Sequence, residues 1–264
     1  MKVLSKSAYG AIGVWLAWCA QTGVLAQSSD QQSFTERLSG LESAVSRLDG
    51  RIAELTKLLK SVLPASPIED VEPQDLQIGS AVVKGSSAAK IAILEFSDYE
   101  CPFCGRHAQT TYTELQRIYV DTGKVKYVFR NLPIESLHPQ AVKAAEAAEC
   151  AGEPGKYWEM HDRLFANQKA LGKSDLLAHA QAIGIETATF QSCLDGGRMS
   201  AKVREDMAEA NRLGLTGTPA FLIGEVRPDG TVRVVRKIGG AHPLPVFQEV
   251  LDSLLAASGT AGSK

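Results

Sequence analysis

Two cysteines separated by two residues, Cys101 and Cys104, are the strongest chemical signal in this 264-residue chain. A short apolar run ends just before them and the residues after them favour a helix, so the pair is expected at a helix N-terminus. There the partial positive charge and the free N–H groups of the helix stabilise the thiolate of the first cysteine. Pro102 fits the first helical turn, where a missing N–H costs nothing. This arrangement predicts a redox-active dithiol.

Other uses of such a pair agree less well with the sequence. A structural zinc site needs four ligands, and although His107 could add a third, no second Cys-x-x-Cys or histidine pair follows. A haem-attachment site would need histidine at position 105, which is glycine. A purely structural disulfide stays open as an alternative, but so small a loop would restrict the unfolded chain little. No phosphate-binding glycine loop is present, and neither a cofactor nor a metal is expected.

Residues 1–26 have the features of a secretory signal peptide. Lys2 and Lys6 give it a positive start, an apolar stretch too short to span a bilayer follows, and Ala26 is a small residue of the kind that cleavage prefers. An uncleaved anchor is the alternative. The mature chain is then expected to begin at Gln27 and to work in an oxidising compartment, the periplasm.

Cleavage would leave four cysteines, because Cys19 is removed with the signal peptide. An even number of cysteines in an exported protein suggests pairing. If Cys101 and Cys104 pair with each other, Cys150 and Cys193 remain, and a structural disulfide between them is predicted; two buried free thiols are the alternative. Loss of the two signal-peptide lysines also changes the formal net charge from −2 to about −4, which does not indicate nucleic-acid binding.

Residues 27–63 contain apolar side chains at alternating spacings of four and three. This heptad pattern, with charged and small residues elsewhere, predicts a coiled-coil stalk and therefore a homo-oligomer. An amphipathic helix packed on the chain's own globular domain is the alternative. The apolar positions are Phe34, Leu38, Leu41, Val45, Leu48, Ile52, Leu55, Leu59 and Val62.

Two features of the stalk disagree about the number of chains. Val45 and Ile52 at a positions, with leucine at d, favour two strands. The segment from Arg37 to Glu42 is similar to the R-h-x-x-h-E signature of parallel trimeric coiled coils, in which the arginine packs across the seam and pairs with a neighbouring chain's glutamate. We expect a trimer in preference to a dimer.

Residues 64–80 carry three prolines and four carboxylates. Proline ends the preceding helix, and the composition predicts an extended, solvated linker. Such a linker would hold the following domain at a variable distance from the stalk. The alternative is that the segment lies against that domain.

Residues 81–256 have the element order β-α-β, a helical block, then β-β-α. Strands are expected at residues 81–84, 90–97, 124–131, 220–223 and 232–238, and helices at residues 102–122 and 243–256. Between them, residues 138–213 are alanine-rich and helical, with breaks at glycines. Residues 257–264 are expected to form a frayed tail. The order predicts an α/β domain with an inserted helical subdomain.

This order and three sequence features resemble the DsbA-like thiol–disulfide oxidoreductases over about residues 81–255. The features are Leu94-Glu95-Phe96 before the dithiol, the size of the helical block, and Gly217-Thr218-Pro219-Ala220-Phe221. The resemblance implies a thioredoxin fold with an inserted α-helical subdomain, here preceded by the coiled-coil helix. It also implies that a cis peptide bond precedes Pro219, which faces the dithiol, and that the backbone of Thr218 is aimed at the active sulfur.

The chemistry and the resemblance together assign roles to the site residues. Cys101, expected to be exposed, is the attacking thiolate, and Cys104, one turn further into the helix, resolves the mixed disulfide. Glu95 matches a buried glutamate of the family and would relay a proton for Cys104; a carboxylate in solvent at the strand end is the alternative. Asp98 and Glu100 are expected at the surface, where they would make the Cys101 thiolate less stable.

The sequence therefore predicts an exported enzyme, a thiol–disulfide oxidoreductase. Exported isomerases of the thioredoxin family are typically oligomeric, so the stalk favours a disulfide isomerase acting on unfolded or misbridged exported proteins. One alternative is a DsbA-like oxidase that introduces disulfides and is reoxidised by a membrane redox partner. A second alternative is a surface-exposed, outer-membrane-associated protein with secondary redox activity.

Overall fold

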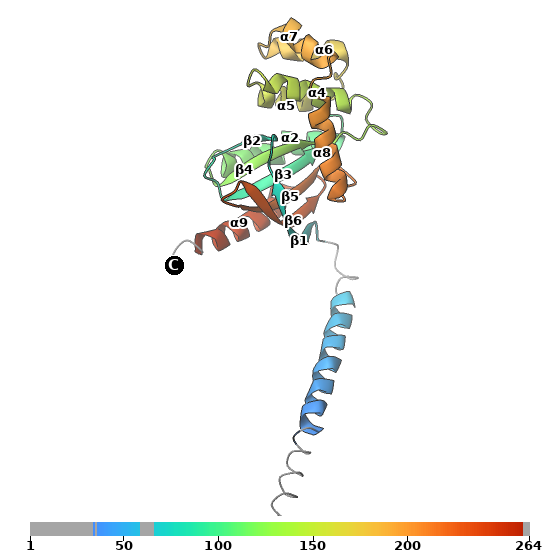
Figure 1. Ribbon diagram of the computed structural model, residues 1–264, viewed down its shortest axis with the longest axis vertical. Helices are drawn as coiled ribbons and strands as arrows, with labels where there is room; N and C mark the ends of the chain where they lie inside the picture. The colour runs from blue at the N-terminus through green and yellow to red at the C-terminus, as the bar shows by residue number, and fades with distance from the viewer. Residues whose placement is uncertain (1–33, 35, 59–65, 261–264) are drawn as a thin grey trace, which may run out of the picture. The chain divides into compact units, whose positions relative to one another are not determined.

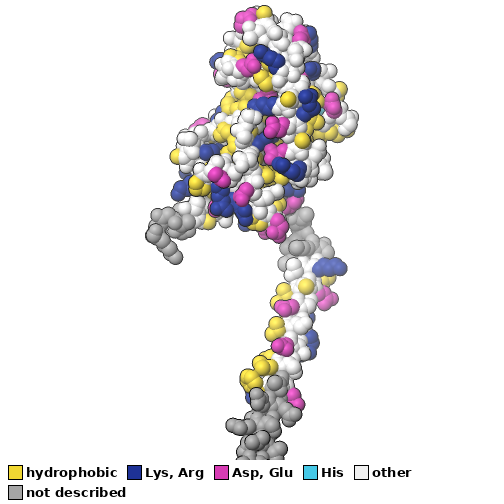
Figure 2. Space-filling model, in the orientation of Figure 1, with side chains coloured by type: hydrophobic (Ala, Val, Ile, Leu, Met, Phe, Trp, Pro, Cys, Tyr) yellow, Lys and Arg dark blue, Asp and Glu magenta, His cyan; other side chains and the backbone are white. Residues whose placement is uncertain are grey.

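The computed structural model describes residues 34, 36–58 and 66–260, and the chain divides into two units, residues 1–65 and 66–264. The expected signal peptide and the heptad residues Leu59 and Val62 lie outside the described residues. In the first unit, residues 36–58 form one helix (Figure 1). Its heptad side chains are 43–63% exposed, and apolar groups are visible along the helix in Figure 2. The helix is thus present, while its pairing with other copies stays a prediction.

The second unit is built on one mixed sheet of six strands in the order β1-β6-β5-β3-β4-β2. The central strand β3 runs parallel to β4 and antiparallel to β5. All seven residues of β3 are buried, because helices cover both of its faces. The strands are β1 (Ile68–Gln77), β2 (Val82–Lys84), β3 (Ile91–Ser97), β4 (Val125–Asn131), β5 (Ala220–Val226) and β6 (Thr231–Gly239).

Strand β1 overturns the prediction of a linker at residues 64–80. Residues 68–77 pair antiparallel with β6 as an edge strand of the sheet. Proline is tolerated there because Pro73 falls between Asp70 and Gln74, where the pairing register shifts, and proline is compatible with bulges and edge strands.

Three of the four carboxylates that favoured a linker instead form a ladder of ion pairs with basic residues of β6. Each acidic residue lies directly opposite its partner in the strand register, so the charges that would keep a free segment in solvent are neutralised across the strands. The pairs are Asp75 with Arg233 at 2.9 Å, Asp70 with Arg236 at 2.9 Å and Glu69 with Lys237 at 3.1 Å.

One face of the sheet packs against the helix that follows the dithiol and against the last helix. The residues expected to form one helix from 102 to 122 are divided into α2 (Pro102–Gln109), α3 (Thr111–Leu115) and the π-helical turn η1 (Gln116–Val120). The last helix, α9, extends from Leu244 to Thr260, so the tail expected from residue 257 is helical through residue 260. The apolar side chains of α3, η1 and α9 meet those of β3, β4 and β5 in one core.

The helical insertion, expected at residues 138–213, lies beyond one end of the sheet (Figure 1). It has its own apolar core, and the end of α8 continues onto the second face of the sheet through Ala210. Within the described part of the chain, no helix is long and apolar enough to cross a membrane. The insertion comprises α4 (Ala141–Gly152), α5 (Tyr157–Ala166), α6 (Lys173–Ala182), α7 (Thr187–Asp195) and α8 (Ser200–Arg212).

Candidate active site

Both cysteines of the dithiol lie at the N-terminus of α2 as free thiols. Cys101 is the N-cap with an extended backbone, and Pro102 is the first helical residue. Cys104 is fully buried, and Cys101 is only 3% exposed. The expectation of an exposed Cys101 is therefore wrong: its side chain packs into the apolar core of the helical insertion and against the loop that contains Thr218.

The two thiols have opposite acidities because their surroundings differ. The Cys104 thiol is the largest influence on Cys101, and with Thr218 and the N–H groups of Cys104 and Phe103 it lowers the pKa of Cys101 to about 5, against the opposing effect of burial. Burial is the main reason why the pKa of Cys104 is raised well above its usual value. At neutral pH Cys101 is therefore a thiolate and Cys104 a thiol.

The loop before β5 faces this pair. The Thr218–Pro219 peptide bond is cis, and the carbonyl oxygen of Thr218 lies 3.6 Å from the sulfur of Cys101. The backbone N–H of Gly240, directly after β6, donates a hydrogen bond of 2.8 Å to the carbonyl oxygen of Pro219 and so holds the loop in place. The sheet thus brings residues more than a hundred positions apart into contact.

Glu95 lies on β3 beneath the dithiol and is 1% exposed, so the alternative of a carboxylate in solvent is wrong. Tyr127 on the neighbouring strand donates a hydrogen bond of 2.5 Å to one carboxylate oxygen. The other oxygen, Oε1, has no partner among the described residues. Burial raises the pKa of Glu95 to about 7, although Tyr127 and Ser97 lower it. The group can therefore gain or lose a proton near neutral pH.

Asp98, expected at the surface, is instead 1% exposed. Its carboxylate accepts hydrogen bonds of 2.8 Å from the backbone N–H groups of Glu100 and Ile134 and from Nδ1 of His138. This residue therefore ties the segment before Cys101 to the loop after β4. Among the residues that the structure describes, no three His, Cys, Asp or Glu side chains are grouped as metal ligands would be.

Gln168, in the loop after α5, is a site residue that the sequence did not reveal. Its side-chain N–H group donates to the carbonyl oxygens of Tyr99 and Cys101, at 2.9 and 2.8 Å. The approach needs a residue without a side chain at position 105, since a Cβ on Gly105 would lie 2.1 Å from Oε1 of Gln168. Gly105, directly after the Cys-x-x-Cys motif, was the only sequence signal of this contact.

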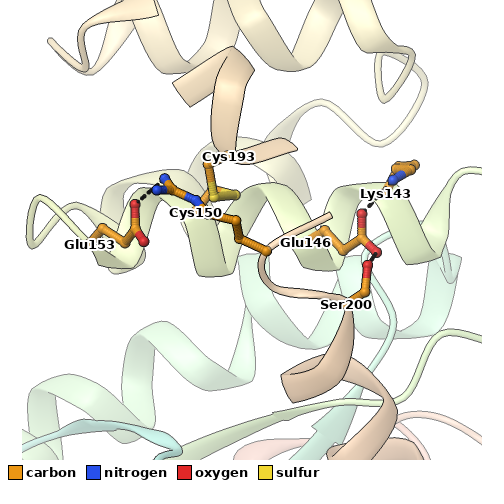
Figure 3. Close-up of a disulfide and its surroundings, with 7 residues drawn as sticks. Lys143, Glu146, Cys150, Glu153, Cys193 and Ser200 are labelled. Atoms are coloured by element: carbon orange, nitrogen blue, oxygen red, sulfur yellow. Dashed lines mark hydrogen bonds and ion pairs between the residues drawn. A yellow bond between two sulfur atoms is a disulfide. The ribbon is translucent and has the colours of Figure 1, made fainter. Parts of the chain in front are cut away.

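A disulfide joins Cys150 on α4 to Cys193 on α7, 43 residues later in the sequence (Figure 3). Polar contacts flank it along α4. Glu146 pairs with Lys143 at 2.6 Å and accepts a hydrogen bond from the hydroxyl of Ser200. Glu153 pairs with Arg198 at 2.6 Å. The disulfide and the contacts made by Arg198 and Ser200 fasten α7 and the start of α8 to α4.

Comparisons with known proteins agree with this geometry. A family model described as Thioredoxin matches residues 78–235. The crystal structure of Wolbachia pipientis alpha-DsbA1 superposes with a TM-score of 0.62 at 24% identity, over 70% of this chain and 96% of that one. The crystal structure of oxidised BdbD from Bacillus subtilis superposes with a TM-score of 0.60 at 22% identity, over 71% of this chain and 100% of that one. A thioredoxin-like oxidoreductase from Silicibacter pomeroyi superposes with a TM-score of 0.54 at 29% identity, over 66% of this chain and 92% of that one.

Curated relatives are similar to this chain over only a small part of their own length. The Na(+)/H(+) antiporter NhaA 3 of Salinispora tropica is 38% identical over 152 residues, which are 58% of this chain and 23% of the antiporter. The antiporter NhaA 1 of Salinispora arenicola is 37% identical over the same lengths. The chain thus spans about a quarter of these relatives.

Proposed function

This chain belongs to the thioredoxin family and has the DsbA-like thiol–disulfide oxidoreductase fold, and we propose that it acts in the periplasm as an oligomeric protein disulfide isomerase. The contrast between the Cys101 thiolate and the Cys104 thiol at one helix N-terminus carries the thiol–disulfide chemistry of this proposal, and the heptad helix of residues 36–58 carries its isomerase direction. Its substrates are unfolded or misbridged exported proteins. Export is supported by the signal-peptide features of residues 1–26.

The isomerase reaction begins with attack of the Cys101 thiolate on a substrate disulfide. A mixed disulfide forms and one substrate sulfur leaves as a thiolate. That thiolate attacks another substrate disulfide, and a later substrate thiolate displaces Cys101, so substrate and enzyme return to their starting oxidation states. When no further substrate thiolate attacks the mixed disulfide, Cys104 attacks it at the sulfur of Cys101. The enzyme then becomes oxidised and the substrate is released in reduced form.

Glu95 serves the Cys104 step as a proton relay. The buried Cys104 thiol must lose its proton to attack and must regain one when it leaves, because its thiolate is unfavourable in this site. The carboxyl group of Glu95 is buried in the same layer and its pKa of about 7 lets it act in both directions.

The helix of residues 36–58 supports an oligomer, with a parallel trimer as the expected form. Its heptad residues place an apolar stripe in solvent in the first unit, which a coiled coil would bury. Several dithiols on one stalk would act on one substrate and be shielded from a membrane oxidant. Both consequences favour the isomerase.

An oxidase is the second candidate, and the pKa of Cys101 supports it. A thiolate stabilised to a pKa of about 5 favours the reduced enzyme and makes its disulfide an effective oxidant. In this case, a membrane redox partner would reoxidise the dithiol after each transfer.

Reactivation of scrambled, misbridged ribonuclease separates the two candidates. The mature protein is compared with a truncation beginning at Ser66, which retains β1 because that strand belongs to the sheet. An isomerase predicts that the full-length protein reactivates the substrate, whereas the truncation only oxidises reduced ribonuclease. The Cys101→Ser variant is the control for dithiol chemistry. If both forms oxidise and neither unscrambles, the protein is an oxidase.

A further inference from the structure

A row of buried polar groups crosses the sheet beneath α2. Ser97 and Glu95 are two residues apart on β3 and therefore point to the same face. Tyr127 on β4 donates to Glu95, and Nε2 of His107 on α2 lies 3.1 Å from the same tyrosine hydroxyl. The row therefore extends from Ser97 on β3 to His107 on α2, which lies one helical turn after Cys104.

The hydrogen bonds of the row fix the state of its last member. Tyr127 has a single hydroxyl hydrogen, which it gives to Glu95, so its oxygen accepts from Nε2–H of His107. Burial lowers the pKa of His107 to about 3, so the ring is neutral and Nδ1 is a bare acceptor. This Nδ1 is buried and has no hydrogen-bond partner among the described residues.

His107 also lines a surface pocket of about 620 Å³. The pocket lies between α2 and α3 and the segment that leads into α9, with Arg106, Thr111 and His242 among its walls. It is large enough for many water molecules. The outer end of the row is therefore next to a route by which protons reach bulk water.

At the inner end of the row, near Cys104, two buried polar groups lie on the same face of β3. Oε1 of Glu95 and the hydroxyl of Ser97 both lack partners of good geometry among the described residues. Ser97 nevertheless lowers the pKa of Glu95 and also that of Cys104, so its hydroxyl lies close to both groups. Ser97 can thus bridge the carboxyl group and the thiol after a small rotation.

We propose that Ser97, Glu95, Tyr127 and His107 form a proton wire between the sulfur of Cys104 and the pocket beside α2. The proposal rests on the proposed thiol–disulfide function. When a substrate thiolate attacks Cys101, the Cys101–Cys104 bond breaks, a bond from Cys101 to the substrate forms, and Cys104 leaves with the electron pair. Glu95 sends a proton to it through Ser97.

The wire then replaces the proton that Glu95 has given up. Solvent that enters from the pocket gives a proton to Nδ1 of His107 and leaves hydroxide there. Nε2–H then passes its proton to the oxygen of Tyr127, and Tyr127 passes its own to Glu95. The observed direction of the hydrogen bonds suits this inward transfer. When each hydrogen is reversed, the same groups carry a proton outward as Cys104 attacks a mixed disulfide.

Aromatic and titratable side chains of neighbouring elements surround His107. Phe221 from β5 and Phe247 from α9 pack on His107, with ring centroids 4.6 and 5.5 Å away. Apart from Cys104, the titratable groups that face it are Tyr112 of α3 and His161 of α5, both buried. The hydroxyl of Tyr112 has no hydrogen-bond partner among the described residues and, unlike that of Ser97, it influences the pKa of neither Glu95 nor Cys104, so it is not part of the wire.

The Tyr127→Phe variant tests the wire, with Tyr112→Phe as a matched control in the same core. Oxidised protein is mixed with dithiothreitol, and the appearance of the Cys104 thiol is followed by acid quenching and alkylation. We expect Tyr127→Phe to slow this step about tenfold or more at about pH 8, where Glu95 is ionised and needs the wire, and to change it little at about pH 6. Tyr112→Phe should behave as the wild type.

A purely electrostatic role for Tyr127 predicts the opposite result at the higher pH. Its hydrogen bond lowers the pKa of Glu95, so its loss would keep Glu95 protonated and maintain or accelerate the step. A rate for Tyr127→Phe equal to or above that of the wild type at about pH 8 therefore overturns the proposal.

Rescue by imidazole tests the outer end. His107→Ala should also be slow at about pH 8, and added imidazole should restore the rate of this variant but not that of Tyr127→Phe. A His107→Ala rate that is normal, or that imidazole leaves low in a protein with the wild-type circular dichroism spectrum, contradicts the wire. Alkylation of Cys101 should be equal in all variants, and if the wild type itself fails to exchange disulfides, the proposed function is wrong instead.

Discussion

At the scale of single residues, the acidity of Cys101 depends on its partner cysteine more than on the helix N-terminus. The Cys104 hydrogen bond is the largest of the influences that lower its pKa. We therefore expect Cys104→Ala to raise the pKa of Cys101 by about one unit or more, and Cys104→Ser, which keeps a donor, to raise it less. The pH dependence of iodoacetamide alkylation measures both values. If both variants retain a pKa of about 5, the N–H groups of α2 dominate instead.

Glu95 makes stability depend on pH in a direction unusual for a carboxylate. Its pKa is raised from 4.5 to about 7, so the folded protein holds a proton that the unfolded chain releases between these values, and stability falls as the pH rises through this window. Glu95→Gln removes the cost of the buried charge. We expect the variant to be more stable than the wild type by about 3 kcal/mol at about pH 8 and of similar stability at about pH 4. Urea denaturation at the two pH values checks this.

An equal stability of Glu95→Gln and wild type at the higher pH would mean that Glu95 is protonated there or is solvated on ionisation. The conservative Glu225→Gln change, at a partly exposed position on β5, is the control and should alter stability little at either pH.

The sequence identified some site residues and missed others for a physical reason. Cys101, Cys104 and Pro219 belong to local motifs, whose spacing is meaningful before folding. Asp98 and Gln168 act through partners 40 and 69 residues away, so nothing near them in the sequence marks their burial. A polar residue after a strand is usually in solvent, and the loop that covers Asp98 is not visible in the local pattern.

At the scale of elements, strand β1 depends on its ion pairs with β6. Each exposed pair contributes at most about 1 kcal/mol, and all three act on one edge strand. We expect the triple variant Arg233→Gln, Arg236→Gln, Lys237→Gln to accelerate amide hydrogen exchange in β1, with little change in β3. High salt should reduce the difference between variant and wild type. Unchanged exchange in β1 would mean that backbone pairing alone holds the strand.

The disulfide of the insertion should matter for stability more than for chemistry. It closes a loop of 43 residues, for which the chain-entropy relation gives about 4 kcal/mol. The Cys150→Ala, Cys193→Ala double variant should lose about this amount in urea denaturation, and the alkylation rate of Cys101 should stay the same. A slower Cys101 would show that the outer helices of the insertion help to position the dithiol.

Most elements could be predicted because their patterns are local. The buried apolar run of β3 and the glycine breaks of the insertion specify their structures directly. Strand β1 could not be predicted, because its proline and carboxylates are typical of a linker. The carboxylates are compatible with a strand only because basic residues of β6, distant in the sequence, lie opposite them. The family model begins at Ile78, immediately after β1, so the family pattern does not include this strand either.

At the scale of the whole molecule, the number of dithiols per assembly decides between the two candidate functions. Arg37 is the residue that should favour three chains over two. We expect sedimentation equilibrium of the mature protein to give three times the monomer mass, and Arg37→Ala to shift it toward a dimer. Leu48→Asp, which places a charge in the seam, should give monomers that still oxidise reduced ribonuclease. A monomeric mature protein would remove the basis for the isomerase.

The two edges of the sheet bear on how such a protein meets unfolded chains. Any exposed strand edge invites an extended segment to add to it, and a protein that handles unfolded clients would be at risk of co-aggregating with them. Here one edge is β2, only three residues long, and the other is β1, which carries four carboxylates and a proline. If the protein acts on unfolded chains as proposed, both edges would disfavour strand addition, and the backbone at Thr218, beside the sulfur of Cys101, would be the place where an extended chain docks.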